Sequence, residues 1–155
     1  MHDSRVVANR FLQLADQAGD SLTPMQLLKL VYIAHGWMLG LYGRPLIRDE
    51  VQAWQYGPVI PRLYNATRQF RSHPVIGPLP ARDDELDRHE SSIVDQVYHI
   101  YGSMTGPALS RLTHAKNTPW DLTYVPGEFG LEISNDIIED HYQRLAETTG
   151  STPDP

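Results

Sequence analysis

Histidine is the residue type in this 155-residue chain best suited to acid–base or metal chemistry, and seven are present. No two of them stand three or four residues apart, so the helical pair of histidines that binds a metal ion is absent. Asp95 and His99, and Ser110 and His114, have one-turn spacing, and serine with histidine is a nucleophile–base pair in principle. No sharp-turn motif presents the serine, and no glycine-rich loop could cradle a phosphate. We therefore predict no catalytic residue, no metal site, no cofactor and no enzyme.

Residues 60–71 combine basic, polar and aromatic side chains and are a candidate contact with nucleic acid. The side chains that could lie on phosphate or read base edges are Arg62, Tyr64, Asn65, Arg68, Gln69 and Arg71. Residues 83–155, however, hold four basic and fourteen acidic residues, whereas phosphate contacts need Lys and Arg. The acidic second half therefore favours the interpretation of residues 60–71 as an ordinary exposed amphipathic helix. The acidic half suits a basic protein partner or serves as a solvated surface.

Two aromatic clusters are candidate contacts with a protein partner. Trp54 and Tyr56 precede Gly57 and two prolines, and Trp120 follows a proline near the other end of the chain. Trp and Tyr bury large areas while keeping one polar atom available, so they serve both cores and interfaces. A tryptophan beside proline in a turn either pins a loop to the core or faces a partner.

Helical periodicity dominates the elements that must position these residues. A one-sided apolar stripe predicts a helix from Asp3 or Ser4 to Ala18. Thr23, Pro24 and Gln26 form a capping box that starts a second helix, which is apolar on nearly every face up to Leu41 and so lies at the centre of the domain. This stretch carries charge and is too short to span a membrane.

One face of the central helix predicts close packing against another element. Lys29, Ile33, Gly36 and Gly40 share that face at 100° per residue. Two glycines four residues apart weaken a helix by about 1 kcal/mol each relative to alanine. They are explained if another element approaches the helix closely there.

Shorter elements follow the central helix. Residues 46–47 and 51–54 predict a hairpin, 59–70 a short helix and 72–83 a loop. Further helices are expected from Asp84 to Gly102, from Gly106, and after Ser134 as a cap, with a turn or a single helical turn around 118–120. The fold class is therefore mainly α, a compact domain of about six helices with a short β-hairpin. It spans residues 1–147, and 148–155 form a flexible tail. The absence of cysteine and of a signal peptide suits a cytoplasmic protein.

Three motifs in this chain resemble the SocA-like, or Panacea, antitoxin domain, also known from phage-associated GepA-type proteins. They are L-T-P-M-Q-L-L-K-L-V-Y-I-A-H-G at 22–36, A-W-Q-Y-G-P-V-I-P-R-L-Y at 53–64 and L-S-R-L-T-H-A-K-N-T-P-W at 109–120. The resemblance covers about residues 5–147. It implies a mostly helical antitoxin that neutralises a cognate protein toxin by direct contact. One mode in the family instead delivers the toxin to an ATP-dependent protease.

The resemblance also bears on three polar residues of the central helix. Lys29, Tyr32 and His35 match the family pattern on a helix expected to be buried. They either complete an internal polar network with Tyr56 or His114, because buried polar groups must be paired, or contact the toxin. Contacts specific to one toxin are expected outside the motifs, in residues 72–90 and on the acidic faces of the last helices.

The sequence therefore predicts an antitoxin that binds its toxin and neither nucleic acid nor a membrane. The alternatives are a DNA-binding regulator using the 60–71 helix and a protease adaptor. The candidate partner-binding residues are Trp54, Tyr56, Arg62, Tyr64, Arg68, Lys29, Tyr32, His35, His114 and Trp120.

Overall fold

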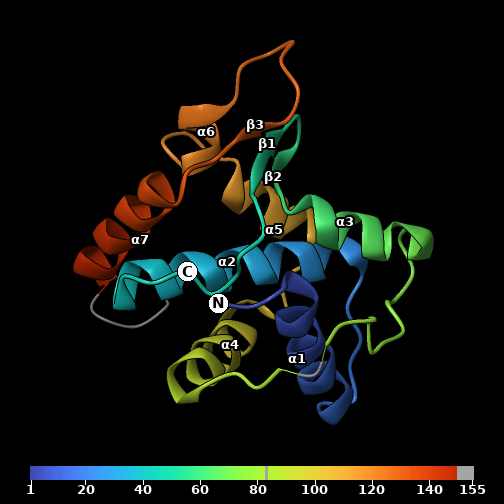
Figure 1. Ribbon diagram of the computed structural model, residues 1–155. Helices are drawn as coiled ribbons and strands as arrows, with labels where there is room; N and C mark the ends of the chain where they lie inside the picture. The colour runs from blue at the N-terminus through green and yellow to red at the C-terminus, as the bar shows by residue number, and fades with distance from the viewer. Residues whose placement is uncertain (83, 150–155) are drawn as a thin grey trace.

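The computed structural model describes residues 1–82 and 84–149, which hold seven α-helices, one short 3₁₀-helix and a three-stranded sheet. The predicted mainly α fold with a short hairpin is confirmed. Helix α2 (Pro24–Tyr42) runs through the middle of the molecule (Figure 1). It separates α1 (Ser4–Gln17) and α4 (Arg88–Tyr101) from α5 (Gly106–Thr113) and α7 (Asn135–Thr149).

The middle of α2 is buried on every side, as its apolar sequence predicts: residues 27–39 are all buried. The predicted capping box is present, because Thr23 Oγ1 accepts from the Gln26 N–H at 3.3 Å and Gln26 Oε1 accepts from the Thr23 N–H at 2.9 Å. Gly43 ends the helix with a left-handed φ of 67°. Among the described residues, no helix is long and apolar enough to cross a bilayer.

Helices α1 and α4 cover one side of α2 with their apolar faces. Asp3 caps α1, whose predicted stripe is buried at Val7, Phe11 and Ala15. The prediction that α4 begins at Asp84 is wrong, because Asp87 and Glu90 form a second capping box and start it at residue 88. Asp84 instead lies 2.6 Å from Nδ1 of the buried His2.

Helix α7 makes the close approach that the glycines of α2 predict. The Tyr142 ring lies directly over Gly36, and a methyl group on Gly40 would stand 2.6 Å from Tyr142 Cβ. Tyr142 also meets Trp37 edge-on, with ring centroids 5.1 Å apart. Residues 148 and 149, predicted as the start of a flexible tail, continue α7, and the rest of that tail falls on residues 150–155, outside those described.

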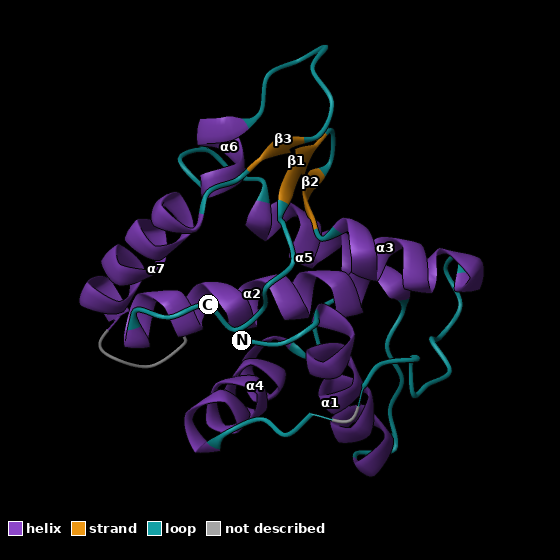
Figure 2. Ribbon diagram, in the orientation of Figure 1, coloured by secondary structure: helices purple, strands orange, loops and turns teal. Residues whose placement is uncertain are grey.

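The small sheet has strand order β2-β1-β3, with both pairs antiparallel (Figure 2). Its strands are β1 (Gln52–Trp54), β2 (Gly57–Val59) and β3 (Leu131–Glu132). The predicted pairing of 46–47 with 51–54 is wrong. The chain instead reverses directly after β1, where Gly57 takes a φ of 126° that favours glycine.

Short helices flank the sheet on both sides. Residues 59–70, predicted as one helix, divide into α3 (Pro61–Thr67) and a 3₁₀-helix (Arg68–Phe70). Of the two expectations for residues 118–120, the single helical turn is correct: these residues begin the short helix α6 (Pro119–Thr123), which Thr118 caps. An exposed loop at residues 124–130 then leads from α6 to β3 and projects from the molecule (Figure 1).

Candidate partner-binding surface

Several of the predicted aromatic residues meet around strand β1. The Trp54 ring contacts Tyr64 of α3 and Phe129 of the projecting loop, each with centroids 5.0 Å apart. The Arg68 guanidinium lies over the Tyr64 ring, 5.9 Å from its centroid. Phe129 is 78% exposed although it packs on Trp54. An aromatic group from three separate elements is thus presented to solvent.

Trp120 joins this group from α6. Its Nε1 donates to the Trp54 carbonyl oxygen at 2.6 Å, which pins α6 to the sheet. The ring stacks on Tyr124 at 4.7 Å and meets His114 edge-on at 5.5 Å. We call the resulting set the aromatic surface; its members are Trp54, Tyr64, Trp120, Tyr124 and Phe129.

The turn of the hairpin is held against the helices by polar side chains beneath it. Ser110 Oγ donates to the Tyr56 carbonyl oxygen at 2.9 Å, and Lys29 Nζ donates to the Pro58 carbonyl oxygen at 2.9 Å. A methyl group on Gly57 would lie 2.9 Å from Lys29 Nζ. The Tyr56 side chain itself is 72% exposed. The carbonyl oxygens of the turn, and not the tyrosine side chain, therefore make the hydrogen bonds with Ser110 and Lys29.

Lys29 and His35 are buried and form hydrogen bonds inside the protein. Lys29 is 3% exposed, and burial lowers its pKa to about 8. His35 Nδ1 accepts from the N–H groups of Leu46 and Ile47 at 3.3 Å, and its Nε2 lies 3.1 Å from Asn135 Oδ1. Burial lowers the pKa of His35 to about 4, which keeps the ring neutral. Neither side chain offers a partner any surface in this conformation, so we interpret both as parts of the scaffold.

Tyr32 is also buried, with its hydroxyl unpaired among the described groups. Burial raises the pKa of this phenol, which therefore stays protonated. The predicted link from Tyr32 to Tyr56 or His114 is not formed.

Arg62 points away from the aromatic surface and toward the N-terminus. Its Nη1 lies 3.2 Å from Asp3 Oδ2, and its Nε lies 3.4 Å from Asp49 Oδ2. A hydrogen bond from Arg5 is the main cause that lowers the pKa of Asp3 to about 2. Arg62 therefore joins α3 to the N-terminal segment instead of presenting free charge.

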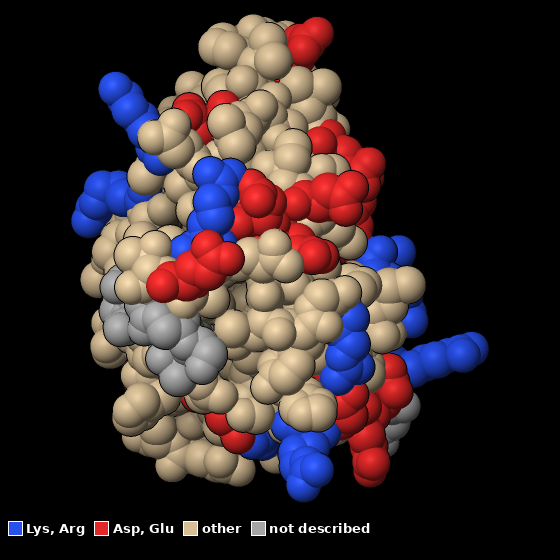
Figure 3. Space-filling view, turned by 90° about the vertical axis from the view of Figure 1, so that its left-hand side faces the viewer, with Lys and Arg blue, Asp and Glu red and all other residues tan. Residues whose placement is uncertain are grey.

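Acidic residues lie next to the aromatic surface. Strand β3 and the start of α7 carry the exposed Glu132, Asp136 and Asp140, and Glu128 is exposed in the projecting loop. Figure 3 shows acidic side chains gathered over the upper half of the face that bears α7. The predicted acidic face of the last helices is therefore real, and it adjoins the loop that carries Phe129.

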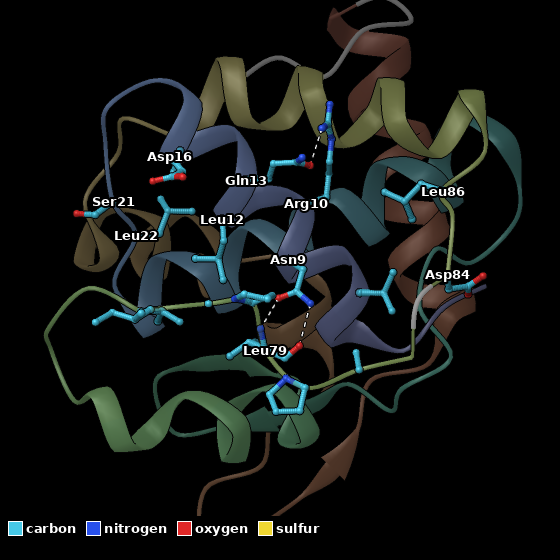
Figure 4. A pocket seen from close by; sticks show the side chains of 18 of the residues that line it. Asn9, Arg10, Leu12, Gln13, Asp16, Ser21, Leu22, Leu79, Asp84 and Leu86 are labelled. Atoms are coloured by element: carbon cyan, nitrogen blue, oxygen red, sulfur yellow. Dashed lines mark hydrogen bonds between the residues drawn. The ribbon is translucent and has the colours of Figure 1, made fainter.

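The other predicted contact region is residues 72–90. Residues 72–82 form a strap across α1, and residues 88–90 are the first turn of α4. Asn9 fixes the strap with two hydrogen bonds: its Nδ2 donates to the Leu79 carbonyl oxygen at 3.0 Å, and its Oδ1 accepts from the Leu79 N–H at 2.7 Å (Figure 4). Strap and helix enclose a groove of about 1230 Å³. Ile76 of the strap is 78% exposed.

The polar residues of the site make hydrogen bonds that hold its backbone in place. Ser110 Oγ lies 3.4 Å from His114 Nδ1 but already donates to the Tyr56 carbonyl oxygen. Within residues 1–82 and 84–149, no group of three or more His, Asp or Glu side chains could hold a metal ion.

The comparison with known proteins agrees with the motifs. The sequence model of the family described as antitoxin SocA-like, Panacea domain, matches residues 27–121. The chain belongs to the SocA-like Panacea antitoxin family. Antitoxin SocA of Caulobacter vibrioides (strain NA1000 / CB15N) is 31% identical over 171 aligned residues, which cover 97% of this chain and 87% of the relative. No solved structure matches significantly.

Of the ten predicted residues, the structure brings together Trp54, Tyr64, Arg68, His114 and Trp120. Sequence reasoning missed Phe129 and Tyr124, which lie beyond the family match at residue 121. The sequence did offer a sign of these two residues: both are aromatic and lie in a glycine- and proline-containing loop, and loops lie on the surface and often carry binding residues. Contact with a partner stays a prediction for all of these residues.

Proposed function

We propose that this protein is the antitoxin of a toxin–antitoxin pair and neutralises its toxin by direct binding through the aromatic surface, in the cytoplasm. The observation that supports this most is the meeting of Trp54, Tyr64 and Trp120, from two separate family motifs, at one partly exposed site with Phe129. Family membership supports the antitoxin role.

The physical basis of the proposed binding is a rigid set of aromatic anchors. Trp and Tyr lose little side-chain entropy on binding and dominate the energetics of protein interfaces. Trp54 and Trp120 are already fixed by indole hydrogen bonds to Gln52 Oε1 and the Trp54 carbonyl oxygen. The exposed Phe129 is then free to enter an apolar pocket of the toxin, while Glu128 and Glu132 beside it favour a basic rim.

The DNA-binding alternative is weakened by the pairing of its basic residues. Arg62 faces Asp3 and Asp49, and Arg68 lies over Tyr64. A duplex-binding measurement at low salt tests this alternative, since binding through phosphate contacts is strongest there. The protease-adaptor alternative predicts that toxin levels fall when the antitoxin is expressed, and only in cells that hold the protease.

A rescue assay with surface variants tests the proposal. The antitoxin and the gene beside its own are expressed from separate inducible promoters, and growth is scored with each alone and with both. We expect wild-type antitoxin to restore growth and Phe129→Ala to weaken toxin binding by about 2 kcal/mol, or some 30-fold in Kd, as for a central anchor. Because Phe129 is exposed, the variant should keep its Tm.

Two comparison variants make the assay specific. Ile76→Ala removes an apolar side chain of equal exposure from the strap, and Tyr42→Ala removes an exposed aromatic at the far end of α2. Both should bind toxin as wild type does. Loss of binding in Ile76→Ala with none in Phe129→Ala would move the interface to residues 72–90. A neighbouring gene whose product is harmless, or toxic without rescue, would leave the antitoxin role unsupported.

A further inference from the structure

A second cavity lies between α5 and α7, on the opposite side of α2 from the groove under the strap. Its volume is about 200 Å³. Tyr32 and Tyr142 line it and are buried, whereas Leu112, at 40% exposed, and the half-buried His141 and Leu145 lie nearer the surface. The cavity is therefore a pocket with a buried floor and a mouth between α5 and α7.

The floor of this pocket holds an unsatisfied polar group. The Tyr32 hydroxyl is buried and has no hydrogen-bond partner among the described protein groups. The two threonines that line the pocket are already engaged: Thr113 Oγ1 donates to the Leu109 carbonyl oxygen at 3.0 Å, and Thr118 Oγ1 to that of Ala115 at 2.7 Å. Buried hydroxyls are normally paired, so an unpaired one beside a cavity points to a group that enters from outside.

We propose that this pocket binds a small uncharged molecule, about one ring in size, whose hydrogen-bond acceptor receives the Tyr32 hydroxyl proton. The size follows from the volume, because an apolar cavity of about 150 Å³ accepts benzene. A carbonyl oxygen on a ring or short aliphatic body fits both the apolar walls, formed by Ile33, Leu112, Pro119 and Leu145, and the unpaired hydroxyl of Tyr32. The hydroxyl of Tyr101, which also lines the pocket, already accepts from Trp37 Nε1 at 3.4 Å. The proposal is independent of the antitoxin role.

The ionisable side chains of the pocket favour an uncharged ligand. Burial lowers the pKa of His141, with a further contribution from Arg144, and both causes favour the neutral imidazole. Burial raises the pKa values of Tyr32 and Tyr142, which keep their protons. A charged ligand would lose its hydration without gaining a counter-charge.

The hydroxyl of Tyr32 also makes a testable difference to the free protein. A buried hydroxyl without a partner destabilises the fold relative to the same ring without it. Tyr32→Phe should therefore raise the Tm of the free protein while removing the hydrogen bond to the ligand. If Tyr32 served only in packing, Tyr32→Phe would not combine a higher Tm with weaker ligand binding.

The experiment is an NMR titration of the full chain with cyclohexanone and with toluene, two rings of similar size of which only the ketone has a strong acceptor. Saturable shifts are expected at residues of α5 and α7 that line the pocket. Wild type should bind the ketone about fivefold more tightly than toluene, the equivalent of one neutral hydrogen bond. Tyr32→Phe should lose this preference and keep the toluene affinity.

Two further variants complete the test. Tyr98→Phe, on α4 and outside the pocket lining, should bind both probes as wild type does. Leu112→Trp, at the mouth, should abolish the shifts for both. Absence of saturable shifts at the lining residues, or an unchanged ketone preference in Tyr32→Phe, would overturn the proposal.

Discussion

At the scale of single residues, His35 carries the clearest dependence on pH. Its neutral ring accepts from two backbone N–H groups, and burial holds its pKa near 4 against an ordinary value of 6.5. Since the unfolded chain takes up a proton near pH 6.5 and the folded chain only near pH 4, stability is complete above pH 6.5 and is lost as the pH falls toward 4. We expect a loss of about 3 kcal/mol in the free energy of unfolding across that window.

Urea denaturation at pH 7, 6 and 5 checks this expectation. His35→Gln, although less stable throughout, should show a flatter dependence on pH than wild type. His99→Gln changes an exposed histidine of α4 and should leave the wild-type slope unchanged. If His35→Gln kept the full slope, another group would be responsible for the titration.

At the scale of elements, the contact of α2 with α7 depends on glycine. Alanine is the better helix former by about 1 kcal/mol, yet a methyl group on Gly40 would stand 2.6 Å from Tyr142 Cβ and 2.8 Å from its carbonyl carbon. Backbone cannot move aside as a flexible side chain can. We therefore expect Gly40→Ala to destabilise the protein by about 2 kcal/mol, measured by chemical denaturation.

Gly43→Ala is the matched control, one residue past the end of the same helix. A methyl group there meets nothing within 4 Å, and only the positive φ of 67° opposes it. Gly43→Ala should therefore lower the free energy of unfolding by only about 1 kcal/mol. Equal stability of Gly40→Ala and wild type would contradict the packing that the structure describes between α2 and α7.

The same two elements show why helices could be predicted and the sheet only in part. The capping box at Thr23 and the glycine face of α2 are local in sequence, so periodicity reveals them. The strand at residues 51–54 is predicted correctly, but its predicted partner is wrong, because β1 pairs with β2 across the turn at Gly57 and with β3, almost eighty residues away. The Leu46 N–H donates to the His35 side chain and the Leu46 carbonyl oxygen accepts from the His2 N–H, contacts that no strand pattern indicates.

At the scale of the whole molecule, charge should govern how fast the toxin is bound. The chain has a formal net charge of −6, and its exposed acidic residues adjoin the aromatic surface. If the toxin presents a basic rim to these acidic residues, as we propose, the association rate should fall roughly tenfold between low and high salt, with little change in the dissociation rate. Stopped-flow mixing at several salt concentrations measures both; an association rate insensitive to salt would contradict electrostatic steering.

The candidate site was predictable only where family motifs supplied its residues. Trp54, Tyr64 and Trp120 could be named from the sequence, but their meeting at one place depends on the Trp120 hydrogen bond to the Trp54 backbone. Lys29 and His35 could not be assigned to the interior with certainty, because a polar residue on a buried helix is compatible with either a network or a contact.

The position of β3 has a consequence for synthesis on the ribosome. Domains begin to fold from the N-terminus as the chain emerges, but Phe129 and the third strand come from the last fifth of this chain. A nascent or prematurely ended chain therefore lacks the finished aromatic surface, whatever the state of α1 and α2. If the proposed function holds, an interruption of translation before the end of β3 yields fragments without protective activity, and the supply of antitoxin reports on nearly complete rounds of protein synthesis.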